Sequence, residues 1–239
     1  MAQSRVLILS NDDGIDAPGL LALEAATASL SGRVVVAPLG PQSGCGHRVT
    51  THQPVKLVER PDGRMSVDGT PADCVRLALH RFGSEIGWVL SGINAGGNLG
   101  ADLHHSGTVA AVREAALHGV PGVAISHYMA RRRVIDWDRA AVWTARVLKT
   151  LMSRPPEVGT FWNVNLPHLE PGGPDPEMVY CEVDQSPLPL SYRQEPEGLV
   201  YSGDYQGRPR TEFSDVAVCF GGRIAVSKVR VMASVWPID

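Results

Sequence analysis

Short apolar runs alternate with helical patterns through the first two thirds of the chain, and this alternation limits the possible folds more than any other feature. Strands are predicted from apolar runs at Arg5 to Ser10, Arg33 to Pro38, Trp88 to Ser91, Val120 to Ser126 and Phe161 to Leu166. Helices are predicted at Pro18 to Ser31, Thr70 to Phe82, Thr108 to Leu117 and Asp136 to Met152. Repeated strand and helix units build parallel sheets, so we expect an α/β fold with a doubly wound, mainly parallel sheet.

The last third of the chain breaks this alternation. Residues 167–209 are rich in Pro and Gly and contain only short strand-like runs, such as Met178 to Val183. A hairpin is also predicted earlier, where Val55 to Glu59 precede the turn Pro61-Asp62-Gly63. A length of 239 residues suits one large domain with an appendage. We therefore expect an α/β core over residues 1–167 and a C-terminal β extension over residues 168–239 that serves in oligomer assembly.

Charge and cysteine usage narrow the class of protein. The formal net charge is -3, which does not suggest a partner as anionic as a nucleic-acid polymer. No apolar run approaches the roughly 20 residues of a membrane-spanning helix, so no membrane role is expected. The cysteines are Cys45, Cys74, Cys181 and Cys219, which form no C-x-x-C pair, and no cleavable signal sequence is apparent. We expect a reduced, cytoplasmic protein.

Polar residues that could carry chemistry begin at the end of the first predicted strand, with Ser10-Asn11-Asp12-Asp13-Gly14. The adjacent carboxylates of Asp12 and Asp13 would repel each other unless a cation or another partner offsets them. Such hard oxygen ligands suit Mg²⁺ or Mn²⁺. A solvated turn is the alternative, because Asp and Gly also favour turns.

Two further clusters follow later strands, where ligands bind in open α/β sheets. The run from Ser91 to Gly100 contains Asn94 and Asn98 among glycines that allow backbone amides to approach a ligand closely. A flexible loop without a ligand is the alternative. The tripeptide Ser106-Gly107-Thr108 precedes a predicted helix, whose free amides could bind phosphate or could simply be capped. Ser43 lies in the loop after the second strand and could reach the same crevice.

These motifs occur in an order that resembles the SurE family of 5'/3'-nucleotidases. The matching runs are SNDDG, DAPG, QSG, DGTPADCV, SGIN, NLG, SGTVAA and REA, and the resemblance spans roughly Val6 to Pro167. It implies a Rossmann-like core and a divalent-metal site formed by Asp12, Asp13, Ser43 and Asn94, and we assign Asp12, Asp13 and Asn94 as the catalytic residues. The metal would be Mg²⁺ or Mn²⁺.

The resemblance also implies a reaction and an assembly. The substrates would be nucleoside 5'- or 3'-monophosphates, hydrolysed by water that the metal activates, and the chain would form homodimers or homotetramers. The residues predicted to contact the substrate phosphate are Asn11, Asn98, Ser106, Gly107 and Thr108. His104 and His105 lie close by and are given no firm role.

The sequence departs from the family pattern in places that bear on substrate choice. His105 stands where a Tyr commonly precedes SGT, Gly97 stands where Pro is common, and residues 45–48 replace a usually Ser-rich stretch. One alternative is therefore a non-catalytic nucleotide-binding or assembly protein that keeps the pocket. A receiver-type signalling domain also binds Mg²⁺ through an acidic pair, but we find neither its phosphate-accepting Asp nor its later Lys.

Overall fold

The computed structural model describes residues 5–130 and 133–232 and contains a nine-stranded sheet. The strands lie in the order β3-β4-β2-β1-β5-β6-β7-β11-β8, and β4, β2, β1, β5, β6 and β7 are mutually parallel. Their bounds are β1 Val6–Ser10, β2 Arg33–Pro38, β3 Leu57–Glu59, β4 Met65–Val67, β5 Ile86–Ala95, β6 Gly122–His127, β7 Thr160–Leu166, β8 Met178–Tyr180 and β11 Ile224–Arg230. The predicted α/β, doubly wound, mainly parallel fold is confirmed.

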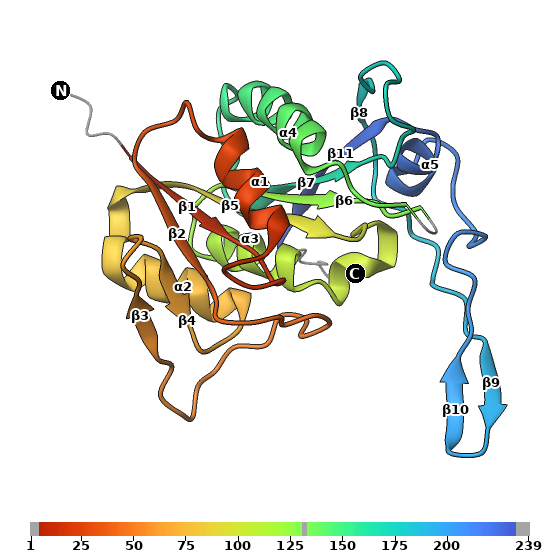
Figure 1. Cartoon of the computed structure of the whole chain (residues 1–239), viewed down its shortest axis with the longest axis horizontal. Helices are drawn as coiled ribbons and strands as arrows, with labels where there is room; N and C mark the ends of the chain where they lie inside the picture. Colours follow the sequence, from red (N-terminus) through yellow and green to blue (C-terminus); the bar gives the residue numbers. More distant parts are fainter. Residues whose placement is uncertain (1–4, 131–132, 233–239) are drawn as a thin grey trace, which may run out of the picture.

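Helices cover both faces of the sheet (Figure 1). They are α1 Pro18–Ala26, α2 Pro71–Phe82, α3 Gly107–Leu117, α4 Trp137–Met152 and α5 Asp215–Phe220, with short 3₁₀ helices η1 Gly83–Glu85 and η2 Gly100–His104. Side chains alternate along β1, so Leu7 and Leu9 pack with α1 and α4, whereas Ile8 packs with α2 and α3 on the opposite face. These two buried clusters form the core and hold the edge of the sheet that carries the site.

Local signals set the start of α2 but not the end of α1. Thr70 and Asp73 form the capping box at the start of α2, as its sequence predicts. Helix α1 ends at Ala26 rather than at Ser31, so that prediction is wrong. The Thr27 hydroxyl donates to the Leu23 carbonyl at 2.8 Å, which competes with continued helix, and the chain proceeds in tighter turns. Leu30 still packs against the core, which explains the helix-like spacing of the sequence.

Strand β5 is longer than predicted and runs through the SGIN motif. It pairs with β6 as far as Ala95, and its register shifts between Ser91 and Asn94. Ser91 lies opposite Ala124 and Asn94 lies opposite Ser126, so β5 holds one extra residue there. A bulge of this kind re-aims a side chain at the end of a strand. Asn94 therefore lies on a strand rather than in a flexible loop.

The C-terminal part of the chain contributes to the main sheet as well as to a projecting arm. Strand β11 pairs antiparallel with β7 and parallel with β8, and α5 packs near β11 and β7. The arm is an antiparallel hairpin of β9 Tyr192–Glu195 and β10 Gly198–Tyr201, which stands clear of the body (Figure 1). Strands on both sides of the predicted boundary at residue 167 thus share one sheet, and the predicted division into core and extension remains a prediction.

Two findings concern possible membrane spans and the cysteines. Among the described residues, no helix is long and apolar enough to cross a membrane. All four cysteines are free, and Cys74 and Cys219 are buried.

Stability should fall at mildly acidic pH because of His127, whose side chain is buried at the end of β6 between Trp143 and His168. Burial lowers the pKa of His127 from 6.5 to about 4. As pH falls from about 6.5 to 4, the unfolded chain binds this proton first, so we expect His127 to remove up to roughly 3 kcal/mol of stability over that interval. Urea unfolding of the parent and of His127→Gln at several pH values measures the difference.

The variant His127→Gln should lose the part of the pH dependence that belongs to this imidazole, whereas the exposed His52→Gln should keep the parent's dependence. If the parent and His127→Gln have identical slopes of unfolding free energy against pH, burial of His127 does not have this effect.

Candidate metal and phosphate site

The acidic pair lies directly after β1, at the carboxyl edge of the parallel strands. Strand β1 lies between β2 and β5. The chain continues from β1 to β2 on one side of this point and from β5 to β6 on the other, so the strand order reverses here. Ligands bind at such a reversal in doubly wound sheets. Asp12 is 5% exposed and Asp13 is partly exposed. The pair is therefore largely withdrawn from water and is not a fully solvated turn.

Asp12 contacts the start of α3, which unites the first predicted cluster with the third. The Thr108 hydroxyl donates a hydrogen bond to Asp12 Oδ1, and Thr108 is fully buried. Ser106 caps α3 by accepting from the Val109 amide at 3.0 Å. A Cβ on Gly107 would stand 2.8 Å from Asp12 Cβ and 3.0 Å from Asp12 Oδ2, so only glycine allows this close approach. Asp12 thus stands at the positive end of a helix.

Asp13 contacts the end of β5, which adds the second cluster. The Ala95 amide donates to Asp13 Oδ2 at 3.3 Å, next to Asn94. The Asn94 amide nitrogen donates to the Gly96 carbonyl at 2.7 Å. This contact orients the Asn94 side chain and leaves its Oδ1 without a hydrogen bond to any described residue. Asn94 can therefore offer a neutral oxygen beside the two carboxylates.

Ser43 is brought to the same edge by its loop. The neighbouring Gln42 amide donates to the Asp12 carbonyl at 2.7 Å, and the Gly46 amide donates to the His105 carbonyl at 3.2 Å. Ser43 itself is exposed. The loop is thus tied to Asp12, just after β1, on one side and to His105, the residue before Ser106, on the other.

A buried carboxylate on α3 holds the far end of this loop. Glu114 is 3% exposed. Its carboxylate forms a hydrogen bond with the His47 imidazole at 2.7 Å and accepts one from the Arg76 guanidinium at 2.8 Å. Burial alone would raise the pKa of Glu114, but the hydrogen bonds from His47 and Arg76 outweigh it and lower the pKa to about 2. Glu114 is therefore ionised at neutral pH and fixes the loop against α3.

The two aspartates are electrostatically unfavourable in the absence of a cation. Burial raises the pKa of Asp12 to about 6. The hydrogen bond from Thr108 lowers this pKa in part, and repulsion by the Asp13 carboxylate raises it further. Burial also raises the pKa of Asp13. A divalent cation between these carboxylates would favour their charged forms.

Asn11 and Asn98, both predicted to contact phosphate, are buried in the interior. The Asn11 amide donates to the Gly14 carbonyl at 2.8 Å, and its Oδ1 has no hydrogen-bond partner among the described residues. The Asn98 amide nitrogen donates to Ser126 at 2.7 Å, and its backbone carbonyl accepts from Asn163 and Asn165. In the structure Asn98 anchors its loop to β6 and β7, and the phosphate contacts of both residues remain predictions.

Several neighbours of the site were not anticipated from the sequence. Cys45 lies beside Asp12, since its sulfur would stand 3.0 Å from a Cβ on Gly107, and burial together with the charge of Asp12 raises the pKa of this thiol. His47 and Glu114 were also missed, because residues 67 positions apart in the chain show no local pattern. His104 and His105 are exposed.

The donors present fit a hard divalent cation. The described residues contain no group of three or more His, Cys, Asp and Glu side chains placed to hold a metal. The available set is two carboxylates with the neutral oxygens of Ser43 and Asn94, which is suited to Mg²⁺ or Mn²⁺ and lacks the nitrogen and sulfur ligands that zinc favours. The unpartnered oxygen of Asn11, next to Asp12 in the chain, adds a further acceptor.

Replacing Gly107 by alanine should damage the cation site. The added methyl group would displace Asp12 or Cys45, although alanine favours the helix itself, so we expect affinity for Mn²⁺ to fall about tenfold or more, equivalent to roughly 1.4 kcal/mol. Isothermal titration with Mn²⁺ measures this. Gly40→Ala is the matched control, because a Cβ there meets nothing within 4 Å. Equal Mn²⁺ affinity in Gly107→Ala and the parent would contradict the assignment.

Comparisons with known proteins identify the family of the chain. The family model described as Survival protein SurE matches residues 7–185. A relative from Nostoc sp. is 55% identical over 227 residues, covering 94% of this chain and 99% of the relative. The 5'-nucleotidase SurE of Moorella thermoacetica is 33% identical, covering 95% of this chain and 90% of its own length. The crystal structure of the SurE protein from Aquifex aeolicus has a TM-score of 0.81 at 31% identity and covers 96% of this chain and 94% of its own. The chain belongs to the SurE family.

Proposed function

We propose that this protein is a phosphatase that hydrolyses nucleoside 5'-monophosphates with the help of a divalent cation. The observation that carries the proposal is the contact between Asp12 and Thr108, because it joins an acidic pair suited to a cation to a helix N-terminus suited to a phosphate. Relatives across the family are named 5'-nucleotidases, which supports the same reaction and substrate class. The proposal extends to nucleoside 3'-monophosphates as substrates of the same site.

One group of residues would hold the cation, and a second group would hold the phosphate. Asp12, Asp13, Ser43 and Asn94 would hold Mg²⁺ or Mn²⁺ at the ends of β1 and β5. When bound there, the cation supplies charge neutralisation for the phosphoryl group and lowers the pKa of water. Ser106, Gly107 and Thr108 present the start of α3 to the phosphate oxygens, where the free amides stabilise negative charge. Water then attacks phosphorus in line with the leaving nucleoside.

Replacing Asp12 by asparagine tests the proposal. The carboxylate would be lost while its shape and most of its packing are kept, so we expect release of phosphate from AMP to fall roughly 100-fold or more in Mn²⁺ or Mg²⁺. Asn94→Ala and Ser43→Ala should cause smaller losses, since each removes one neutral ligand. The control is Asp16→Asn, whose carboxylate is exposed and pairs with Arg60.

The same assay separates an enzyme from a protein that only binds nucleotide. The parent should release phosphate from AMP, and excess EDTA should abolish the release until Mn²⁺ is restored. A parent that binds AMP without releasing phosphate under any of these conditions would favour the non-catalytic alternative. Parallel reactions with 3'-AMP and with other bases identify the preferred substrate.

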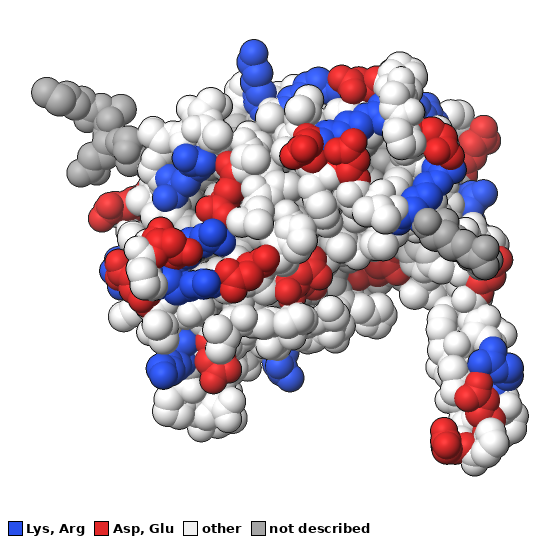
Figure 2. All heavy atoms as spheres, in the orientation of Figure 1, with Lys and Arg blue, Asp and Glu red and all other residues white. Residues whose placement is uncertain are grey.

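Assembly into homodimers or homotetramers through the β9–β10 arm is part of the proposal. The arm stands away from the body in Figures 1 and 2, and around it Leu190 is 88% exposed and Leu199 is 65% exposed. Apolar side chains held in this way are typical of a surface covered by another copy. A cytoplasmic location is also proposed, and it rests on the four free cysteines.

The double variant Leu190→Ser, Leu199→Ser should weaken this assembly. Both changes remove apolar area in or next to the arm and lie outside the nine-stranded sheet, so we expect the average mass in sedimentation equilibrium to shift toward the monomer while the circular dichroism spectrum is unchanged. The paired control is Leu21→Ser, an exposed leucine on α1. An unchanged mass for the double variant would argue against the arm as the contact.

A further inference from the structure

The 3₁₀ helix η2 connects the loop of Asn98 to the start of α3, where the phosphate is proposed to bind. It spans Gly100–His104, with Asn98 anchored to β6 and β7 just before it and Ser106 just after it. The amides of His105 and Ser106 donate to the Asp102 carbonyl at 3.0 and 3.1 Å. Any displacement of Asp102 therefore moves Ser106 and the start of α3.

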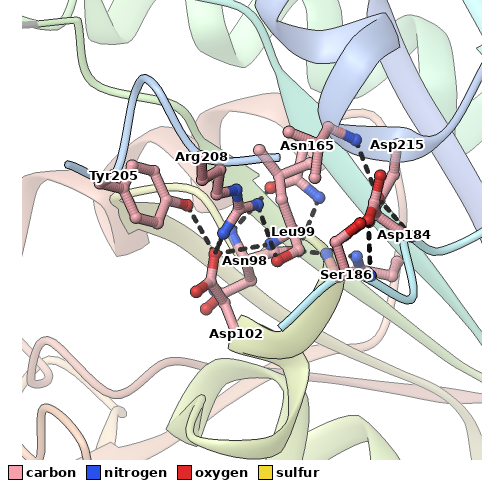
Figure 3. Close-up of polar contacts among 12 residues, drawn as sticks. Asn98, Leu99, Asp102, Asn165, Asp184, Ser186, Tyr205, Arg208 and Asp215 are labelled. Atoms are coloured by element: carbon pink, nitrogen blue, oxygen red, sulfur yellow. Dashed lines mark hydrogen bonds and ion pairs between the residues drawn. The ribbon is translucent and has the colours of Figure 1, made fainter. Parts of the chain in front are cut away.

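Asp102 is held by two side chains from a segment more than 100 residues later in the chain (Figure 3). The Tyr205 hydroxyl donates to Asp102 Oδ2 at 2.5 Å. Arg208 donates to the same oxygen at 3.2 Å and to the Leu99 carbonyl at 3.0 Å. We call Asp102, Tyr205 and Arg208 the Asp102 clamp.

Burial of Arg208 restricts the Asp102 clamp to one arrangement. The Arg208 side chain is 3% exposed, and its guanidinium lies over the Tyr205 ring at 4.5 Å. A buried guanidinium is strongly unfavourable without its partners, so Arg208 is stable only while Asp102 and Leu99 stay in place. Burial and the charge of Asp102 raise the pKa of Tyr205, which therefore remains a protonated donor at all physiological pH values.

A second anchor from the same part of the chain holds the residues before Asp102. Asp215, at the start of α5, accepts from the Gly100 amide at 2.9 Å, and its other oxygen accepts from the Asp184 amide at 2.9 Å (Figure 3). The Leu99 side chain is fully buried with Val216 and Val218 of α5. The C-terminal segment thus forms hydrogen bonds with a side chain, an amide and a carbonyl group of the short loop over residues 99–102.

We propose that the Asp102 clamp positions η2, and with it the start of α3, for phosphate binding, so that Tyr205 and Arg208 are positioning residues of the site. This inference rests on the proposed phosphatase function and gives the C-terminal segment a role inside its own chain, separate from assembly through the arm. Neither residue is assigned a contact with substrate. Their effect reaches the phosphate through Asp102 and the backbone of η2.

The variant Tyr205→Phe tests the clamp with the smallest change, because it removes one hydroxyl and keeps the ring under Arg208. We expect kcat/KM for AMP to fall about fivefold to tenfold and the inhibition constant of orthophosphate to rise by a similar factor. Affinity for Mn²⁺, measured by titration, should stay at the parent value, because the proposed cation ligands do not contact Tyr205. Tyr192→Phe, on the exposed arm, is the matched control.

The variant Arg208→Lys separates positioning from charge. Lysine keeps the positive charge but cannot reach Asp102 and the Leu99 carbonyl with the paired geometry of a guanidinium, so it should show the same rise in the orthophosphate constant. Hydrogen exchange of the amides over residues 99–106 should be faster in both variants, while exchange in β1 and β2 should not change.

The possible results are distinct. A purely structural role would lower thermal stability or the fraction of active protein and leave KM and the orthophosphate constant unchanged, which would overturn the proposal. Parent-like orthophosphate binding and exchange in both variants would also overturn it. If the parent releases no phosphate from AMP, the proposed function fails, and orthophosphate binding in Mn²⁺ together with hydrogen exchange still decides whether the clamp orders η2.

Discussion

A carboxylate buried at the end of β1 determines how the surrounding segments are arranged. Asp12 is 5% exposed, and a buried negative charge is stable only with partners that offset it. The partner on the protein side is Thr108 at the start of α3, whose helix end also favours negative charge. Glycine at position 107 makes this contact possible, because a side chain there would overlap Asp12. The remaining imbalance, visible in the raised pKa of Asp12, is what a divalent cation would remove.

The loops around Asp12 are fixed by buried polar contacts rather than by their own sequences. Glu114 on α3 holds the loop of Ser43 through His47, and Asn163 and Asn165 on β7 hold the loop of Asn98. Hydrogen bonds of this kind are costly to break because the groups left behind would be buried and unpaired. They therefore keep both loops, each rich in glycine or polar residues, in a single arrangement near Asp12.

The C-terminal segment takes part in this arrangement at a distance from the arm. Tyr205, Arg208 and Asp215 contact the loop between β5 and α3, while Leu99 packs among the apolar residues of α5. The extension thus has two separate physical features, an apolar arm that projects and a buried polar network that faces inward. Only the first is suggested by its richness in Pro, Gly and short strand-like runs.

The sequence alone determined the features that depend on neighbouring residues. The parallel sheet follows from apolar runs alternating with helices, the start of α2 follows from Thr70 and Asp73, and the acidic pair and its companion motifs follow from their positions after strands. Tertiary structure alone decided the early end of α1, the bulge that places Asn94, the internal role of Asn98 and the attachment of Asp102 to Tyr205 and Arg208. The reason is physical: periodicity and capping act within about one turn or strand, whereas a buried charge selects its partner from whatever residues the finished fold brings within hydrogen-bond distance.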